Sequence, residues 1–211
     1  MRFIHPPRPI SRINPDNLAK YEVTPWTGQR KFNGTRNVIH LGSDGTAEVF
    51  TKGGEQHKQW ELSPEVKDQL FSLDLNPKFD YWLDSELLHR KTATPHYKNR
   101  IVLFDIMFAG KYFFNGPTTA ERYDILKSIC RDPKELESEN GIALAVTENV
   151  WLAETFPHTE LVTEYSRYLE KPEIEGLVLK KANARIENLG RKKYEVSWLV
   201  RCRKPHKNYT F

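Results

Sequence analysis

Short runs of β-branched and aromatic residues, separated by turn signals, constrain the fold of this chain more than any other feature. Residues 38–41 and 47–50 flank an Asp-Gly turn and predict a β-hairpin. No apolar stretch is long enough to predict a membrane-spanning helix. Further strands are predicted at residues 81–88, 100–108, 112–114, 142–147, 175–181 and 194–203.

Helices are predicted between these strands. Ser63 is placed to cap a helix at 64–73, with proline at its first position. Thr118, with a glutamate three residues later, predicts a capping box at the start of a helix at 119–130. A third helix is predicted at 159–169, with inward-facing Leu161, Val162, Tyr165 and Leu169.

Hairpins interspersed with helices favour an α+β domain built on antiparallel sheets over a parallel, doubly wound sheet. At 211 residues we expect one domain spanning 1–211. The first 25 residues contain five prolines, which disfavour helix and predict an extended lead-in segment.

The composition is that of a folded protein, with 38% apolar and 12% aromatic residues. Neither a signal peptide nor a membrane helix of roughly 18 apolar residues is evident, so we expect an intracellular, cytoplasmic protein that does not contact a membrane. Cys130 and Cys202 are too few for a disulfide framework and lack zinc-ligand spacing, which fits a reducing compartment.

Basic residues crowd the last twenty-one positions, although the net charge of the chain is only +4. Such a cluster is able to meet phosphates without reading sequence, and a solvated charged face that binds nothing is the alternative. The candidates for nucleic-acid contact are Arg191, Lys192, Lys193, Lys204 and Lys207.

Several charged residues fall within or beside the predicted strands. Lys31 precedes a predicted Asn-Gly turn, and Arg36 follows it; on its own this short pattern indicates only a surface lysine beside a turn. Asp84 and Glu86 share one face of a strand, where burial requires a cation, a ribose or a metal ion as partner. Side chains alternate between the two faces of a strand, so Glu175 and Lys180 are predicted to lie on opposite faces. Together these residues have the chemistry to bind a nucleoside triphosphate with a divalent metal.

In order and spacing, these segments resemble the motifs of the covalent nucleotidyltransferases, the family of polynucleotide ligases and mRNA capping enzymes. The resemblance covers roughly residues 27–204. Residues 31–36 resemble the first motif, lysine-x-aspartate-glycine-x-arginine; 49–55, 83–88, 102–108, 175–180 and 198–203 resemble the later ones. It implies an ATP-grasp-like nucleotidyltransferase fold of two antiparallel sheets flanked by helices, with the nucleotide in the cleft between them.

The resemblance also implies a reaction. Lys31 would attack the α-phosphorus of ATP, expel pyrophosphate and hold AMP as a phosphoramidate; the AMP would then pass to a 5′-phosphate, and a 3′-hydroxyl would displace it. Glu86 and Glu175 would hold Mg²⁺ or bond the ribose, and Phe104 would stack on adenine. The remaining nucleotide contacts would come from Arg30, Arg36, Lys52, Lys180, Arg201 and Arg203.

This sequence departs from the family pattern in three respects. Asn33 stands where the first motif has aspartate, which removes a charge near Lys31. Arg201 and Arg203 stand where the fifth motif has lysines, and arginine is unable to act as a general acid at working pH. Seven residues follow Lys204, so we expect no C-terminal oligonucleotide-binding (OB) domain.

Several functions are compatible with the motifs. A DNA ligase acting as a monomer on nicked duplex DNA is favoured by residues 102–108 and 175–180, whereas Asn33 favours an RNA ligase. A capping guanylyltransferase fits less well because that branch typically carries aspartate in place of Glu175. A non-catalytic nucleic-acid-binding relative is the alternative outside enzymes, supported by the altered fifth motif.

Overall fold

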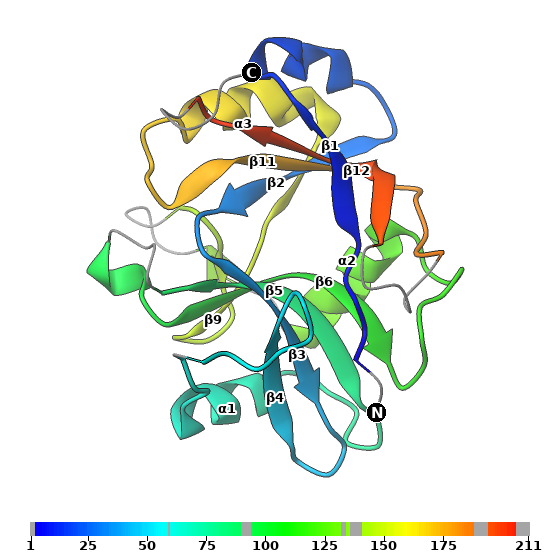
Figure 1. The fold of residues 1–211 in the computed structure, drawn as a ribbon, viewed down its shortest axis with the longest axis vertical. Coiled ribbons are helices and arrows are strands. Elements are labelled where there is room, and N and C mark those ends of the chain that lie inside the picture. The colour runs from blue at the N-terminus through cyan, green and yellow to red at the C-terminus, as the bar shows by residue number, and fades with distance from the viewer. Residues whose placement is uncertain are drawn as a thin grey trace.

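The computed structural model describes residues 3–58, 60–89, 94–131, 134–135, 141–187 and 194–205, and in this part the chain forms two β-sheets with helices around them (Figure 1). Four of the basic residues predicted to contact nucleic acid lie outside the described residues; these are Arg191, Lys192, Lys193 and Lys207. No helix in the described part is long and apolar enough to cross a membrane.

The first sheet has five strands in the order β1-β12-β11-β2-β10. These strands are β1 (Arg8–Ile13), β12 (Glu195–Arg203), β11 (Ile174–Lys181), β2 (Trp26–Phe32) and β10 (Thr155–Pro157). The second sheet has seven strands in the order β4-β3-β5-β6-β9-β8-β7. They are β4 (Ala47–Thr51), β3 (Thr35–Leu41), β5 (Tyr81–Leu88), β6 (Arg100–Ala109), β9 (Val150–Leu152), β8 (Leu144–Ala145) and β7 (Lys134–Glu135).

Both sheets are mixed, so the prediction of two antiparallel sheets was wrong in this detail. β1 runs parallel to β12, and β6 runs parallel to β9, while the other pairs are antiparallel. The parallel pairs join segments far apart in the chain, because parallel strands need a long connection that single-strand patterns do not reveal. The overall α+β class was predicted correctly.

Except for β2, the long strands and the β3–β4 hairpin confirm the sequence predictions, but the short strands do not. β2, β7, β9 and β10 were not predicted, and β8 covers only two of the six residues predicted at 142–147. Residues 112–114 form isolated bridges to Phe108 and Ile186 in place of a strand. Three-residue strands are too short for an alternating pattern to identify them.

The predicted helices are present with their predicted caps. α1 (Pro64–Phe71) is capped by Ser63, and α2 (Thr119–Ile129) begins with a complete capping box. Two 3-10 helices, η2 (Pro95–Tyr97) and η3 (His158–Glu160), precede β6 and the third α-helix.

α3 (Leu161–Arg167) is shorter than predicted, and only part of its predicted inner face is buried. Leu161 and Tyr165, four residues apart, are buried, whereas Val162 is 39% and Leu169 41% exposed. Val162 lies about 100° around the helix from Leu161, and Leu169 follows the helix end, so neither lies on the packed face.

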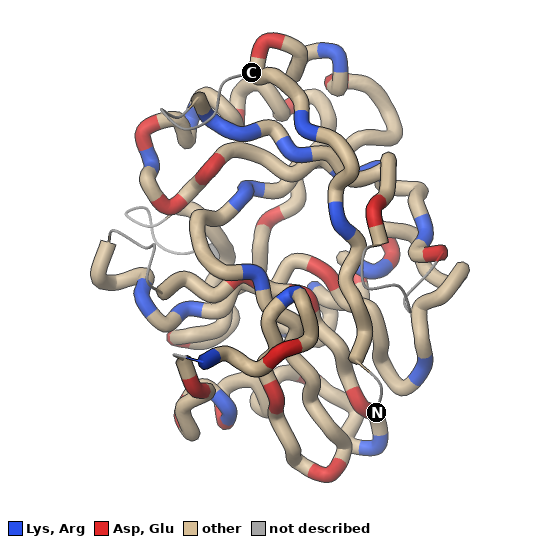
Figure 2. The backbone as a smooth tube through the Cα atoms, viewed as in Figure 1, with Lys and Arg blue, Asp and Glu red and all other residues tan. Residues whose placement is uncertain are grey.

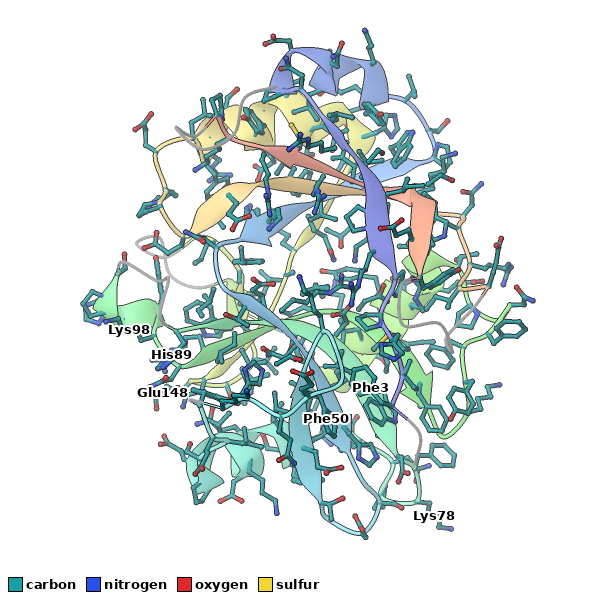
Figure 3. All side chains as sticks on the ribbon, in the orientation of Figure 1. Phe3, Phe50, Lys78, His89, Lys98 and Glu148 are labelled. Carbon is teal, nitrogen blue, oxygen red and sulfur yellow. The ribbon has the colours of Figure 1, made fainter. Side chains whose placement is uncertain are left out.

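The amino-terminal segment contacts both sheets. Residues 8–13 are extended, as predicted, and pair with β12, whereas Pro15–Tyr21 forms the 3-10 helix η1, which had been predicted not to be helical. Its proline lies in the first turn, where no backbone donor is needed. Phe3 packs against Phe50 with ring centroids 5.4 Å apart, on the second sheet (Figure 3).

The two sheets are held together by two apolar clusters. One includes Trp82 and Met107 of the second sheet with Val196 of the first. The other includes Phe32 of the first sheet and Val102 of the second. Members of both clusters, such as Trp198 and Phe32, also line the cavity in which the candidate site lies.

Candidate active site

A cavity of about 490 Å³ lies between the sheets. Its walls come from the first sheet through β1, β2, β11 and β12, and from the second through β3, β5 and β6. Every residue predicted to contact the nucleotide contributes to the lining: Arg30, Lys31, Arg36, Lys52, Glu86, Phe104, Glu175, Lys180, Arg201 and Arg203. Backbone positions of basic residues occur on β12 and β2, and the neighbouring β11 has one acidic position, Glu175 (Figure 2).

Lys31 forms a close ion pair on the wall of the first sheet. Its Nζ lies 2.5 Å from Oε2 of Glu175, and Nε of Arg203 lies 3.3 Å from the same oxygen. All three side chains are partly accessible from the cavity, with 18 to 24% of their surface exposed. A lysine amine is therefore held beside a carboxylate and a guanidinium in reach of a ligand.

A β-bulge brings Glu175 to the cavity and corrects the prediction made from simple alternation. In β11, Ile174 pairs with Phe32 and Gly176 pairs with Lys31, so Glu175 is an extra residue between the two pairs. Because of this insertion, Glu175 and Lys180 both line the cavity, although alternation placed them on opposite faces.

Arg36 lies on the wall of the second sheet. Its Nε donates to Oδ1 of Asp84 at 2.9 Å and its Nη2 to the Pro7 carbonyl oxygen at 2.9 Å; a further hydrogen bond joins Nη2 to Oδ2 of Asp84. The Asp84 side chain is 1% exposed, so it depends on this fork for compensation of its charge. The fork holds Arg36 at the cavity wall.

Glu86 faces the same cavity from β5. Burial raises the pKa of Glu86 to about 7, against the opposing effects of Lys31 and Arg36. Its Oε1 accepts a hydrogen bond from the backbone N of Gly34 at 3.1 Å. The negative charge of Glu175 also raises this pKa, which shows that the two carboxylates act on one another.

Two cations lie near the ring of Phe104. The Cζ of Arg36 is 5.5 Å from the ring centroid, and the Nζ of Lys180 is 5.4 Å from it. Lys180 also donates to the Phe104 carbonyl oxygen at 3.0 Å. Burial lowers the pKa of Lys180 to about 8. The partly buried ring offers a stacking surface inside the cavity.

Behind Phe104, a buried ion pair supports the strand. Arg122 of α2 donates to both oxygens of Asp105, at 2.8 and 3.0 Å. Burial alone would raise the pKa of Asp105, but Arg122 and Lys180 outweigh it and the pKa is lowered. Sequence reasoning missed Arg122, although its spacing from Leu126 placed a cation on the apolar stripe of the helix.

The guanidinium of Arg30 is bound by protein side chains outside the cavity. Its guanidinium donates to Glu154 and Glu164 at 2.8 Å each and lies 4.3 Å from the ring centroid of Tyr168. It is only 6% exposed. These contacts tie β2 to α3 and to the segment before β10.

Two lysines predicted as ligand contacts differ in surroundings. Lys52 lies in the turn after β4, where its carbonyl oxygen accepts from Nη2 of Arg8 at 3.0 Å. Lys204, predicted to contact nucleic acid, donates from Nζ to the Lys171 carbonyl oxygen at 2.8 Å. Arg8 also lines the cavity and was missed because its proline-rich surroundings indicated only a lead-in.

Gln29 is a second lining residue that sequence reasoning missed. It is 3% exposed, and its Nε2 donates to Oγ1 of Thr155 at 2.9 Å. Nothing in its local sequence distinguishes it from an ordinary strand residue.

The donor set fits a magnesium ion bound together with a phosphate ligand. No cluster of three or more metal-ligating side chains occurs among the residues that the structure describes. Mg²⁺ is commonly held by one or two carboxylates plus substrate phosphates and water, and Glu86 and Glu175 meet that requirement. A carboxylate whose pKa is raised to about 7 gains from a cation nearby.

The fold and the site thus define an α+β protein with two packed sheets and a lysine–carboxylate pair in the cavity between them. The sequence matches no protein-family model and no curated protein.

Solved structures match the fold. The "mycobacterial DNA ligase D complexed with ATP and MES" has 15% identity and a TM-score of 0.62, over 96% of this chain and 62% of that one. The ligase domain of M. tuberculosis LigD has 15% identity and a TM-score of 0.63, over 95% and 60%. An archaeal ATP-dependent RNA ligase has 16% identity and a TM-score of 0.50, over 93% and 48%.

This chain has the fold of the nucleotidyltransferase domains of ATP-dependent DNA and RNA ligases, as the motifs predicted. It spans about three fifths of the two DNA ligase chains.

Proposed function

We propose that this chain is the nucleotidyltransferase domain of an ATP-dependent polynucleotide ligase, and that ATP adenylates Lys31. The observation that carries the proposal is the contact of Lys31 with Glu175, whose Oε2 also lies near Nε of Arg203, inside a cavity between the sheets. An isolated surface lysine would have no reason to lie in such a cavity, whereas a nucleophile requires neighbours that manage its proton and the charge on its substrate.

The chemistry follows from these neighbours. An ammonium group has no lone pair, so Lys31 must lose a proton before it attacks; Oε2 of Glu175 at 2.5 Å is in hydrogen-bonding distance to receive it. The nitrogen then forms a bond to the α-phosphorus while the bond to pyrophosphate breaks. Arg203, together with Arg201 from the same strand, stabilises the negative charge on the phosphate oxygens.

In this proposal, further side chains of the cavity bind the adenine ring and the metal ion. Adenine stacks on Phe104, and the Oε1 of Gln29 is available as an acceptor for the exocyclic amine because its Nε2 is bound to Thr155. Glu86 and Glu175 would hold Mg²⁺, which would neutralise phosphate charge.

The adenylate next passes to the 5′-phosphate of a nucleic acid, and a 3′-hydroxyl displaces AMP to join the strands. We favour nicked duplex DNA as substrate on the motifs at 102–108 and 175–180. RNA is the second candidate, supported by the match to an archaeal RNA ligase and by Asn33. Lys204 remains a proposed phosphate contact.

The first experiment tests adenylation. The protein is incubated with Mg²⁺ and α-labelled ATP or GTP, and label that survives denaturation is quantified beside Lys31→Ala. Lys20→Ala is the matched control, because Lys20 is exposed on η1 and bonds only Asn17 among its described contacts. We expect label from ATP in the wild type and in the control, and none in Lys31→Ala.

Protein that arrives already adenylated would hide the reaction, so its mass is measured first and pyrophosphate is used to remove any AMP. Failure of the stripped protein to take label from ATP would refute adenylation of Lys31 and favour a non-catalytic binding relative.

A second experiment assigns the substrate. Labelled protein is mixed with nicked duplex DNA or with RNA ends, and transfer of AMP and sealing are followed separately. Sealing of DNA alone would support the DNA ligase assignment, and sealing of RNA alone would overturn it in favour of the RNA ligase.

A further inference from the structure

Asn33 ties the crossover between the two sheets to the loop before β11. Its backbone N donates to the Glu173 carbonyl oxygen at 2.7 Å, and its side-chain Nδ2 donates to the Pro172 carbonyl oxygen at 3.2 Å. Asn33 lies directly between β2, which carries Lys31, and β3, which carries Arg36. Asn33 therefore joins the β2–β3 crossover to the loop that leads into β11.

The loop held by Asn33 leads into the bulge that carries Glu175. The bulge begins after Ile174, two residues beyond the carbonyl that accepts the Asn33 amide. On the far side, the backbone N of Lys204 donates to the Glu175 carbonyl oxygen at 2.8 Å, and its Nζ holds the Lys171 carbonyl oxygen. Glu175 is thus fixed between Asn33 on the β2 side and Lys204 on the β12 side.

The amide of Asn33 is used as a donor. Its partner, the Pro172 carbonyl oxygen, only accepts, so an aspartate of the same shape would lose the side-chain bond and place negative charge against that oxygen. The carboxylate of Glu173 lies in the same loop and is 2% exposed, its Oε1 accepting from the backbone N of Thr94 at 3.2 Å. A second carboxylate beside this loop adds like charge.

We propose that Asn33 is a positioning residue that sets Glu175 against Lys31 through its amide donor, so that asparagine in this chain works where the resembled first motif has aspartate. The inference rests on the proposed adenylation of Lys31. It predicts that restoring the aspartate of the motif slows the reaction.

The test compares Asn33→Asp and Asn33→Ala with the wild type in single-turnover adenylation of Lys31, with the KM for ATP and the Tm measured for each. Loss of one hydrogen bond predicts adenylation slower by about threefold for Asn33→Ala, and the added charge by about tenfold for Asn33→Asp. The KM for ATP should stay within about twofold, because the stacking surface at Phe104 belongs to the other sheet. Asn17→Asp, the same chemical change on η1, is the matched control and should leave the rate unchanged.

The outcomes separate the inference from the proposed function. Absence of label in the stripped wild type refutes adenylation itself. A labelled wild type with Asn33→Asp as fast or faster overturns the positioning role alone. So does a loss of rate accompanied by a matching fall in Tm and rise in KM, because that pattern indicates general destabilisation of the fold.

Discussion

Gly176→Ala tests whether the bulge in β11 sets both the stability and the chemistry of the site. Gly176 has φ +138°, and a Cβ built on it would lie 2.0 Å from the Cys202 carbonyl oxygen and 2.9 Å from the Cα of Arg203. Both neighbours are backbone atoms of β12, which have no rotamer to change. The substitution must therefore push β11 and β12 apart next to Glu175.

The structure gives the size of the effect in two parts. Forcing a residue with a Cβ into this region of φ costs about 1–3 kcal/mol. Separating the strands weakens about two ladder hydrogen bonds, each worth about 0.5–1.5 kcal/mol. The sum, about 2–6 kcal/mol, is a large part of the 5–15 kcal/mol that typically stabilises a domain of this kind.

Gly45→Ala is the matched control. Gly45 also has a positive φ, +81°, but no atom lies within 4 Å of its hypothetical Cβ, so it reports the conformational cost without a clash. We expect a loss of about 1–2 kcal/mol for this variant. Urea unfolding followed by tryptophan fluorescence gives both free energies of unfolding, and the label assay gives the adenylation rates.

Gly176→Ala should lose at least 1 kcal/mol more than the control and adenylate Lys31 at least tenfold more slowly under conditions where both variants are folded. Equal losses of stability would show that the strands absorb the added methyl group. An unchanged adenylation rate would show that Glu175 does not need the bulge geometry, and either result would refute this reasoning.

Further predictions concern Phe104 and the charges around it. Arg122→Met leaves Asp105 buried without its partner and should lower the free energy of unfolding by about 3–5 kcal/mol in urea melts, with much of it recovered when Asp105→Leu is added; no recovery would mean that Arg122 acts mainly by packing. The pKa of Lys180 is lowered from 10.5 to about 8, so the folded state binds fewer protons than the unfolded state between these pH values. The free energy of unfolding of the wild type should therefore rise from pH 8 to 10.5, by up to about 3 kcal/mol relative to Lys180→Met. Parallel pH profiles of the two proteins would contradict this. Phe104→Leu should raise the KM for ATP about tenfold through lost stacking, and an unchanged KM would place the base elsewhere.

Local chemistry was enough to predict much of this molecule. The caps at Ser63 and Thr118, the hairpin from 38 to 50 and most of the long strands depend on neighbours a few residues away, so the sequence predicts them well. The motif that contains Lys31 likewise directed attention to residues that the structure brings to one cavity.

Pairing between distant segments was left to the tertiary structure. Whether β1 would join β12, and whether Arg8 would reach the cavity, depended on an edge that exists only once the first sheet has formed. The buried pair of Arg122 and Asp105 likewise joins residues seventeen positions apart, whose contact no local pattern specifies.

The sequence by itself determined the α+β class, the order of the helices and of most long strands, and a set of charged residues with the chemistry to bind a nucleotide. Only the tertiary structure decided that Glu175 meets Lys31, because one inserted residue in β11 reverses the face that alternation assigns to it. Such an insertion is stabilised by contacts from β12 and from Asn33, which lie far from it in the chain and next to it in space.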